Sequence, residues 1–305
     1  MIIKVNRVEQ QFIHKSHPLY EIVDRHCFYS KNVYNQANYI IRQAFTKENE
    51  IIKANDIQKL MQCRFVPKGE YYIMEIVYEI DVPDCSEEIN RVCAVDLGVE
   101  NFITVVNNFG EQPFIIKGGA LKSTNQYYNK QKAKLQSKLK KNENKDWSKR
   151  LEKLTNKRYE KIKYLMHCIS KQLVDYCVLH NVDTLVIGLN KKWKQENGSM
   201  QNFTYIPYDL FINQVKSKCE QNGIKCIIVQ EAYTSGTSFL DGELPTKENY
   251  DKERRVYRGL FVSKSGKTIN ADVNGAYQIM KKVVPDVFNK GIEDVGLHPL
   301  RLKVA

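Results

Sequence analysis

Residues 93–101 of this chain read CAVDLGVEN, an apolar strand with Asp96 at its end. Far along the chain, residues 269–276 read INADVNGA and put Asp272 near the start of a helix. A carboxylate at the end of a buried strand, paired with one at a helix start, can assemble a divalent-metal site from distant segments. Two or three carboxylates that hold Mg²⁺ can hydrolyse a phosphodiester, so these stretches predict both a fold and a chemistry.

Each aspartate also has a purely structural explanation. Asp96 can be a turn residue before Leu97 and Gly98, and Asp272 can be a first-turn acid that the helix dipole favours. Either explanation suffices for one residue. The two acids occur together at both metal-binding positions of one predicted fold, which favours the site.

The segments around this strand predict an α/β domain. Three strands come first, and two long helices follow, before a strand, a helix, a strand and a last helix. The expected strands are 92–97, 102–106, 113–116, 184–187 and 224–229, and the expected helices are 120–141, 147–180, 208–222 and 271–283. This order is that of a ribonuclease-H-like domain, with the first strand central and the fourth and fifth beside it in turn.

The N-terminal part predicts a small β domain that helices interrupt. Residues 1–15 have the pattern of a strand, and a hairpin is expected at 64–78 around a turn at 67–70. Between them the pattern predicts a helix from Ser16 to about Phe45 and a short one at 55–61.

Composition restricts the class of protein. The chain has 305 residues, 42% of them hydrophobic, and shows neither a membrane-length apolar stretch nor a signal peptide, so a cytoplasmic protein without membrane contact is expected. Its eight cysteines never occur as C-x-x-C, which argues against a disulfide framework and against a Cys₄ zinc site.

The net charge of +12 is concentrated in one region. Residues 117–163 hold sixteen Lys or Arg against four acids, and the rest of the chain balances at 31 against 31. A solvated charged helix face is the simplest explanation, but the excess is too one-sided for i,i+4 pairing. A basic stripe of this kind indicates contact with nucleic-acid phosphates.

Several motifs together resemble the TnpB (transposon OrfB) proteins, the compact relatives of the type V CRISPR effectors. The resemblance implies a RuvC nuclease domain, a split β-barrel (wedge) domain with a helical recognition insertion, a guide RNA and a double-stranded DNA target. It covers most of the chain. The motifs are DLGVEN at 96–101, TLVIGLN at 184–190, YTS at 233–235 and NADVNGA at 270–276, with wedge-like segments at 9–18 and 65–69.

The resemblance also implies domain boundaries. The wedge would comprise 1–17 and 62–82, a reduced recognition insertion 18–61, and the RuvC domain 91–305. Full-length relatives carry a larger recognition domain. The usual four-cysteine zinc ribbon is missing, and residues 232–267 form an insertion in its place, so no zinc is expected.

The chain also departs from the family's pattern in the active site. Gly188 stands where the family's fourth-strand Glu is expected. Glu231 follows the fifth strand directly, and parallel neighbours lie about 4.8 Å apart with their carboxyl ends at one edge. We therefore expect the third metal ligand to have moved to Glu231. Asp96, Glu231 and Asp272 would then form a catalytic triad for two-metal hydrolysis with Mg²⁺, or Mn²⁺, as cofactor.

Other residues are expected to bind nucleic acid. Lys191, Lys192, Trp193 and Lys194 follow the fourth strand, and basic residues around a Trp suit stacking and phosphate contact with a nucleic-acid strand. Arg254 and Arg255, in the insertion, are expected to act likewise or to form a lid. Asp241 and Glu243 are weaker metal-ligand candidates in what looks like a mobile loop.

The leading interpretation is an RNA-guided DNA endonuclease of transposon origin. One alternative is a nuclease-dead, repressor-like protein that binds DNA through a guide, as the absent Glu at 188 suggests. Another is an unguided RuvC-type junction nuclease. The short recognition region predicts strongly salt-sensitive binding or a homodimer.

Overall fold

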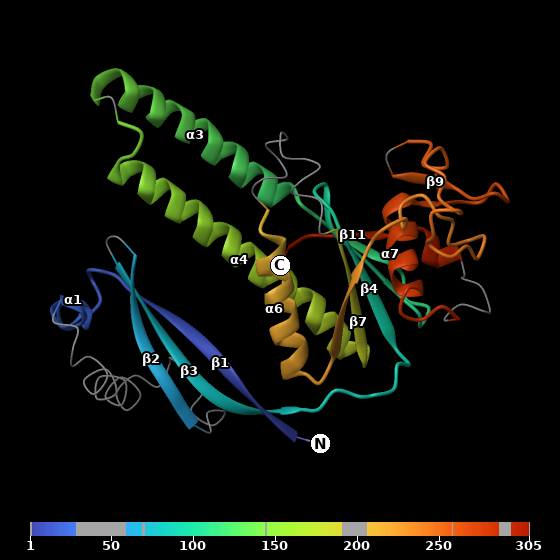
Figure 1. The fold of residues 1–305 in the computed structure, drawn as a ribbon, viewed down its shortest axis with the longest axis horizontal. Coiled ribbons are helices and arrows are strands. Elements are labelled where there is room, and N and C mark those ends of the chain that lie inside the picture. Colours follow the sequence, from blue (N-terminus) through green and yellow to red (C-terminus); the bar gives the residue numbers. More distant parts are fainter. Residues whose placement is uncertain are drawn as a thin grey trace. The chain divides into compact units, whose positions relative to one another are not determined.

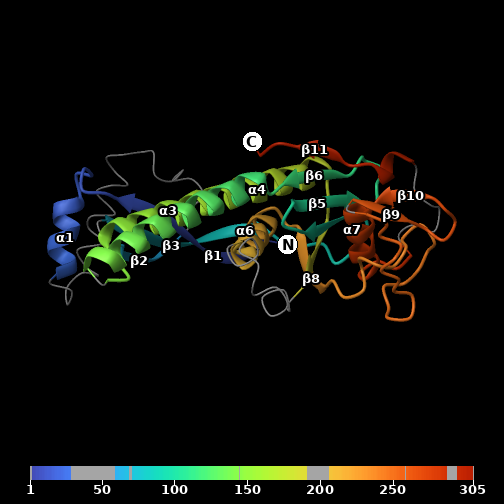
Figure 2. The same ribbon diagram turned by 90° about the horizontal axis from the view of Figure 1, so that it is seen from above.

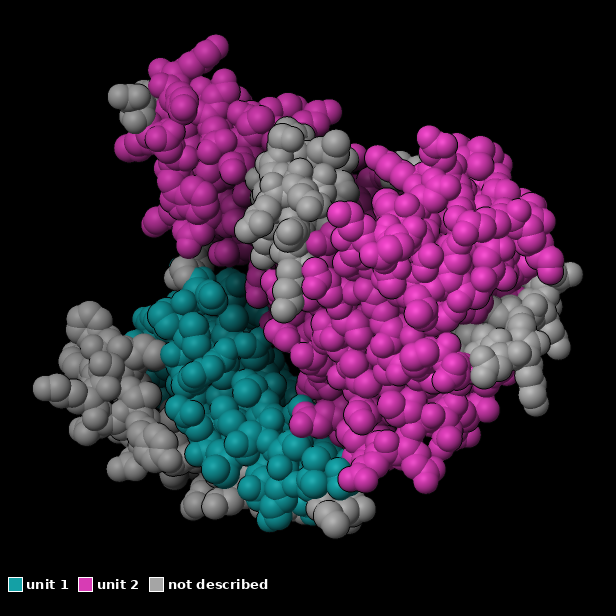
Figure 3. Space-filling view, turned by 45° about the vertical axis from the view of Figure 1, so that its right-hand side comes forward, with its two compact units in different colours: residues 1–84 teal, residues 85–305 magenta. Residues whose placement is uncertain are grey.

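The structure is a computed structural model that describes residues 2–28, 59–68, 71–143, 145–190, 206–257, 259–286 and 294–304. The chain divides into two compact units, Met1–Asp84 and Cys85–Ala305, which Figure 3 colours separately. Each unit is described by itself. In the described part of the chain, no helix combines the length and the apolar character needed to cross a membrane.

The first unit is a three-stranded antiparallel sheet with one described helix. β1 (Ile2–Ile13) and β2 (Lys59–Lys68) both pair with the central β3 (Tyr71–Pro83), and α1 (Tyr20–Phe28) follows β1. Its core contains Ile13, Val23, Cys63, Met74 and Ile76. Because β1 and β2 do not pair with each other, the described sheet is open, and the barrel expected from the sequence stays a prediction.

The prediction of a short helix at 55–61 is wrong over its last residues. Residues 59–61, predicted to end a helix, belong to β2, where Lys59 pairs with Glu79 and Leu60 with Tyr78. Pairing with a neighbouring strand outweighs the weak local helix pattern there. Most of the expected recognition insertion, 29–58, lies outside the described residues.

The second unit is built on a six-stranded mixed sheet (Figure 1). Its order is β11-β6-β5-β4-β7-β8, with β4, β7 and β8 mutually parallel and β5 antiparallel to both of its neighbours. The central position of β4, with β7 and then β8 beside it, is the arrangement predicted from the sequence. The strands are β4 (Val92–Leu97), β5 (Asn101–Asn107), β6 (Phe114–Lys117), β7 (Thr184–Leu189), β8 (Lys225–Gln230) and β11 (Leu300–Leu302).

Helices cover both faces of this sheet, as Figure 2 shows. Alternate residues of β4 separate the faces: Cys93, Val95 and Leu97 belong to the core with α4 (Lys149–Leu179) and α6 (Tyr208–Gln221). Val92 and Ala94 belong to the core with α7 (Ala271–Lys281). Because side chains alternate along a strand, Asp96 shares the α7 face with Val92 and Ala94.

The basic region forms a helical hairpin. α3 (Gly119–Glu143) and α4 are long helices that pack against each other, and Ser148 caps α4 by accepting a hydrogen bond from the Leu151 N–H. The Arg158 guanidinium lies over the Tyr128 ring, 5.2 Å from its centroid, and its Nε donates to Asn125. These contacts join the helices where they meet and leave many of their lysines exposed.

The insertion at 232–267 is mostly irregular and contains β9 (Leu260–Val262), which pairs with β10 (Thr268–Asn270) ahead of α7. A short 3₁₀ helix (Asp294–Leu297) leads to β11, which pairs with β6 in parallel. The sequence did not predict these short strands, because three residues carry too little periodicity to indicate one.

Candidate active site

Asp96 lies near the end of the central strand, on the face that α7 covers. Its register partner on β5 is Thr104. Gly275 of α7 allows the helix to come very close: a Cβ atom at this glycine would lie 3.2 Å from the Asp96 Oδ2 atom. The helix backbone therefore packs directly over the carboxylate.

Asp272 is fixed by the start of α7. Asn270 is the N-cap, and its side-chain oxygen accepts hydrogen bonds from the N–H groups of Asp272 (3.0 Å) and Val273 (3.2 Å). Two side chains hold the Asp272 carboxylate: Asn101 Nδ2 donates to Oδ2 at 2.6 Å, and Arg255 Nη2 donates to Oδ1 at 3.1 Å. The asparagine of the motif at 96–101 thus contacts the acid of the motif at 270–276.

Glu231 reaches the same region from the end of β8. A Cβ atom built on Gly188 would lie 3.2 Å from the Glu231 Oε2 atom and 2.3 Å from Ile279 Cδ1. The Glu231 carboxylate and the Ile279 side chain therefore occupy the space into which a side chain at 188 would point. Strand register explains the approach, because Gly188 pairs with Val229, two residues before Glu231 and on the same sheet face.

The three carboxylates influence one another. Burial raises the pKa of Asp96 well above its usual value, the nearby Glu231 and Asp272 raise it further, and Arg255 opposes the shift. Burial raises the pKa of Glu231 to about 7, although Lys282 lowers it. Among the described residues, the buried Glu231 Oε2 atom has no hydrogen-bond partner. The site thus brings three carboxylates together, with Arg255 and Lys282 as the cations that act on them.

The carboxylates do not converge on one point in this structure. In the part of the chain that is described, no three His, Cys, Asp or Glu side chains are arranged to hold a metal ion. In this arrangement the two oxygens of Asp272 accept hydrogen bonds from Asn101 and Arg255. The predicted metal role of the triad stays a prediction.

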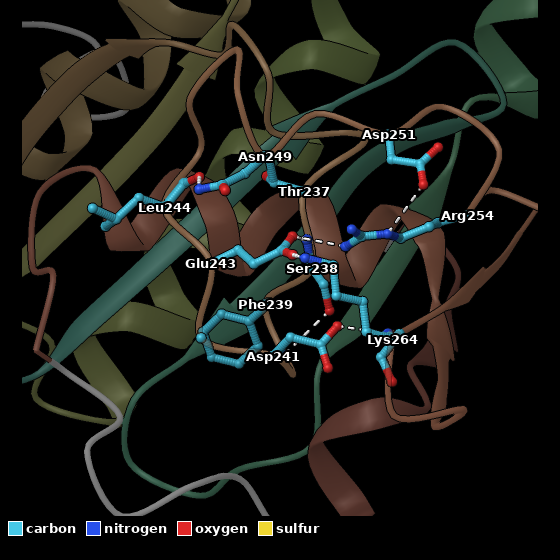
Figure 4. Close-up of polar contacts among 12 residues, drawn as sticks. Thr237, Ser238, Phe239, Asp241, Glu243, Leu244, Asn249, Asp251, Arg254 and Lys264 are labelled. Atoms are coloured by element: carbon cyan, nitrogen blue, oxygen red, sulfur yellow. Dashed lines mark hydrogen bonds and ion pairs between the residues drawn. The ribbon is translucent and has the colours of Figure 1, made fainter.

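The insertion is organised around Glu243, as Figure 4 shows. The Glu243 side chain is only 8% exposed, with Arg254 Nη1 at 2.7 Å from its Oε2 and Lys264 Nζ at 2.8 Å from its Oε1. The Ser238 N–H donates to the same carboxylate, and the Lys264 N–H donates to Asp241 at 2.7 Å. Both acids therefore have structural partners in the insertion, which the sequence had suggested was a mobile loop.

The predicted nucleic-acid contacts have different outcomes. Arg254 is 12% exposed and ion-paired with Glu243 and Asp251, so its guanidinium is committed within the insertion. Arg255 is 37% exposed and contacts Asp272. Their binding roles remain predictions. Lys191, Lys192, Trp193 and Lys194 lie outside the described residues.

Sequence reasoning missed two contributors to the site. Tyr208, at the start of α6, donates its hydroxyl proton to the Gly98 carbonyl at 3.0 Å, and burial beside Glu231 and Asp96 raises its pKa. Lys282 donates to two carbonyls of the turn that carries Glu231. No local pattern indicates either residue, because their partners lie 110 and about 50 residues away.

Comparisons with known proteins identify related sequences. The family described as probable transposase (OrfB_IS605) matches residues 75–194, and the Cas12f1-like TNB domain matches residues 208–279. The chain is 26% identical over 208 residues to the TnpB-like protein ORF457 of Acidianus two-tailed virus, which covers 66% of this chain and 44% of that protein.

A similar fold is found among solved structures. The Cas12f1 chain of a cryo-EM complex with sgRNA and target DNA matches 91% of this chain with a TM-score of 0.55 and 18% sequence identity. The match covers 59% of that Cas12f1 chain. This chain thus spans about half the length of these relatives.

Proposed function

Because the chain belongs to the TnpB family, we propose that it is an RNA-guided DNA endonuclease with a RuvC-type active site at Asp96, Glu231 and Asp272. One observation carries the proposal: the Glu231 carboxylate reaches to 3.2 Å from the Cβ position of Gly188, where the family's glutamate would begin. The nuclease-dead alternative depends on that missing glutamate, and a carboxylate supplied by Glu231 in its place weighs against it.

The side chains suit divalent-metal chemistry. Three carboxylates, raised pKa values at Asp96 and Glu231, and a buried Glu231 oxygen without a partner among the described residues form an environment that a hard dication would stabilise. Asp96, Glu231 and Asp272 would hold Mg²⁺ or Mn²⁺. When bound, the metal would supply a nucleophilic water and stabilise the leaving oxygen.

The protein's own groups prepare this site. The Asn270 cap fixes the first turn of α7, and Asn101 orients the Asp272 carboxylate by donating to Oδ2. Arg255 neutralises Asp272 from the partly exposed side. Full use of Asp272 as a ligand would require this guanidinium to move, and a phosphate of the nucleic acid is a suitable alternative partner for it.

The α3–α4 hairpin supports the proposal of RNA and DNA as partners. Most of the chain's excess positive charge lies on these two helices, and large aromatic side chains are exposed beside the lysines. They are Tyr127 (62% exposed), Tyr159 (49%) and Tyr164 (67%). Exposed tyrosines among lysines provide stacking and phosphate contact for a nucleic-acid strand.

The test of the active site is substitution of Glu231 by Gln in protein purified with its RNA. We expect cleavage of a matched duplex to fall by at least a hundredfold with RNA binding unchanged, as also for Asp96→Asn. The exposed Glu253→Gln variant is the matched control. Cleavage at the wild-type rate by Glu231→Gln would contradict the proposed site.

The test of the nucleic-acid surface uses salt. Lys130, Lys134 and Lys138 are exposed and lie one above another on α3. Replacing all three with Gln is expected to reduce the slope of log K against log salt for RNA binding by about 2 to 3. Lys171→Gln on α4, whose lysine pairs with Asp175, serves as the control. An unchanged slope would remove this surface from the proposal.

A further inference from the structure

Lys282 makes a pair of backbone contacts at the edge of the site. Its ammonium donates to the carbonyl oxygens of Gln230 and Ala232, each at 2.7 Å. These two residues flank Glu231 on either side. A lysine has three donors and a flexible stem, so one side chain can bind both carbonyls of a turn.

The turn needs such support because Glu231 lies beyond the sheet. β8 ends at Gln230, so the pairing with β7 does not fix the backbone of the next residue. Thr234 binds the remaining carbonyl: its hydroxyl donates to the Glu231 oxygen at 2.9 Å. Tyr233 has a positive φ of 66°, an unfavourable backbone conformation that surrounding contacts must maintain.

The backbone around Glu231 is therefore well hydrogen-bonded, whereas its side chain is not within the described part of the chain. The carbonyls of residues 230, 231 and 232 are all bound, whereas the carboxylate oxygen Oε2 has no hydrogen-bond partner among the described residues. This is the pattern of a group held in place for something that the protein itself does not supply.

The position of Lys282 connects this turn to the other carboxylates. Lys282 is the C-cap of α7, the helix whose first turn carries Asp272 and whose Gly275 lies against Asp96. Ile279, one turn before Lys282, fills the space beside Gly188. A cation at a helix C-terminus is also favoured by the helix dipole.

We propose that Lys282 is a positioning residue that holds the turn at 230–232 so that Glu231 reaches the carboxylate site in place of a side chain at 188. This inference rests on the proposed function, since it assumes that Glu231 is a metal ligand. The Lys282 ammonium donates to protein carbonyls, so the role proposed for it is to hold the backbone of the turn.

The chain provides a closely matched control. Lys281, the neighbouring residue, donates to the carbonyls of Gly242 and Glu243 in the insertion. Lys281→Met and Lys282→Met each remove one ammonium with two carbonyl partners and keep most of the apolar stem. They differ in which turn they release, so a general loss of stability should affect both.

The experiment measures binding of Mn²⁺ alone by calorimetry, together with the Mg²⁺ dependence of cleavage. We expect Lys282→Met to weaken Mn²⁺ binding about tenfold or more, as loss of a group that orients a ligand does. The KM for DNA should stay unchanged, and excess Mg²⁺ should restore much of the rate. Lys282→Arg, which can still donate to both carbonyls, should retain near wild-type affinity, as should Lys281→Met.

Two results separate failure of the inference from failure of the proposed function. If Lys282→Met binds Mn²⁺ as wild type does while Glu231→Gln does not, the positioning role is wrong and the site stands. If Glu231→Gln itself keeps full Mn²⁺ binding and cleavage, the proposed site is wrong and the inference loses its premise. Should Lys282→Met fail to fold, Lys282→Gln is measured, and a loss equal to that of Lys281→Gln overturns the positioning role.

Discussion

Replacing Gly188 with Ala tests whether the space beside this glycine is closed, as the structure requires. The new methyl group would lie 2.3 Å from Ile279 Cδ1, 2.9 Å from Ile279 Cγ1 and 3.2 Å from the Glu231 carboxylate. Ile279 is fully buried in the core under α7, so its side chain has no free space to rotate into. The substitution must therefore strain the core or displace Glu231.

Overpacking of this kind destabilises a protein by about 1–3 kcal/mol. For a unit of this size, a loss of about 2 kcal/mol lowers Tm by about 4–8 °C. Gly119→Ala is the matched control, because nothing lies within 4 Å of its Cβ position and its backbone is not left-handed. That variant should be neutral or slightly stabilised, since alanine favours the helix that begins there.

A double-mutant cycle with Ile279→Val identifies the cause. Valine lacks the Cδ1 atom that makes the 2.3 Å contact, and alone this change should cost about 0.5–1.5 kcal/mol. In the double variant we expect a recovery of about 1 kcal/mol relative to the sum of the single losses. Thermal unfolding measures all four proteins. A neutral Gly188→Ala, or strictly additive losses, would refute the reasoning.

Three further perturbations have defined outcomes. Glu243→Gln should lower the stability of the insertion by about 2 kcal/mol, measured by hydrogen exchange. Since its hydrogen-bond and ion-pair partners lower the pKa of Glu243 to about 2, the stability that the ionised Glu243 contributes is present above pH 4.5 and is lost as the pH falls towards 2. A stability that is flat over this range would contradict the prediction. Asn270→Ala should cost about 1 kcal/mol in thermal unfolding, and Asn270→Ser should restore most of it; equal losses would exclude a capping role. The raised pKa of Glu231 should cost the metal-free protein about 3 kcal/mol of stability as the pH rises from 4.5 to about 7, and the raised pKa of Asp96 adds a loss of the same sign. Glu231→Gln should remove the Glu231 part of this dependence in urea titrations at several pH values, and an unchanged slope would refute it.

The sheet of the second unit could be predicted because its strands carry strong local patterns. β4 is apolar throughout except for Asp96, and the predicted bounds of the two long helices differ from the observed ones by few residues. The short strands β9, β10 and β11 could not be predicted. They exist because a partner strand supplies hydrogen bonds, and that information lies elsewhere in the chain.

The candidate site was predictable to a similar extent. Strand order and side-chain alternation are enough to bring Asp96 and Glu231 to one face of the sheet. The cationic partners were not predictable, since Arg255 on Asp272 and Lys282 on the Glu231 turn depend on long-range packing. Arg254 looked like its neighbour in the sequence, yet its guanidinium is paired with Glu243 inside the insertion.

The length of α7 has a consequence for sequence variation. Asp272 and Lys282 lie at opposite ends of this helix, ten residues apart. Asp272 is one of the three carboxylates, and Lys282 binds the turn that carries Glu231. Inserting or deleting one residue between them would turn one end by about 100° relative to the other and shift it by about 1.5 Å. Functional descendants of this chain should therefore tolerate substitutions along α7 more readily than any change in its number of residues.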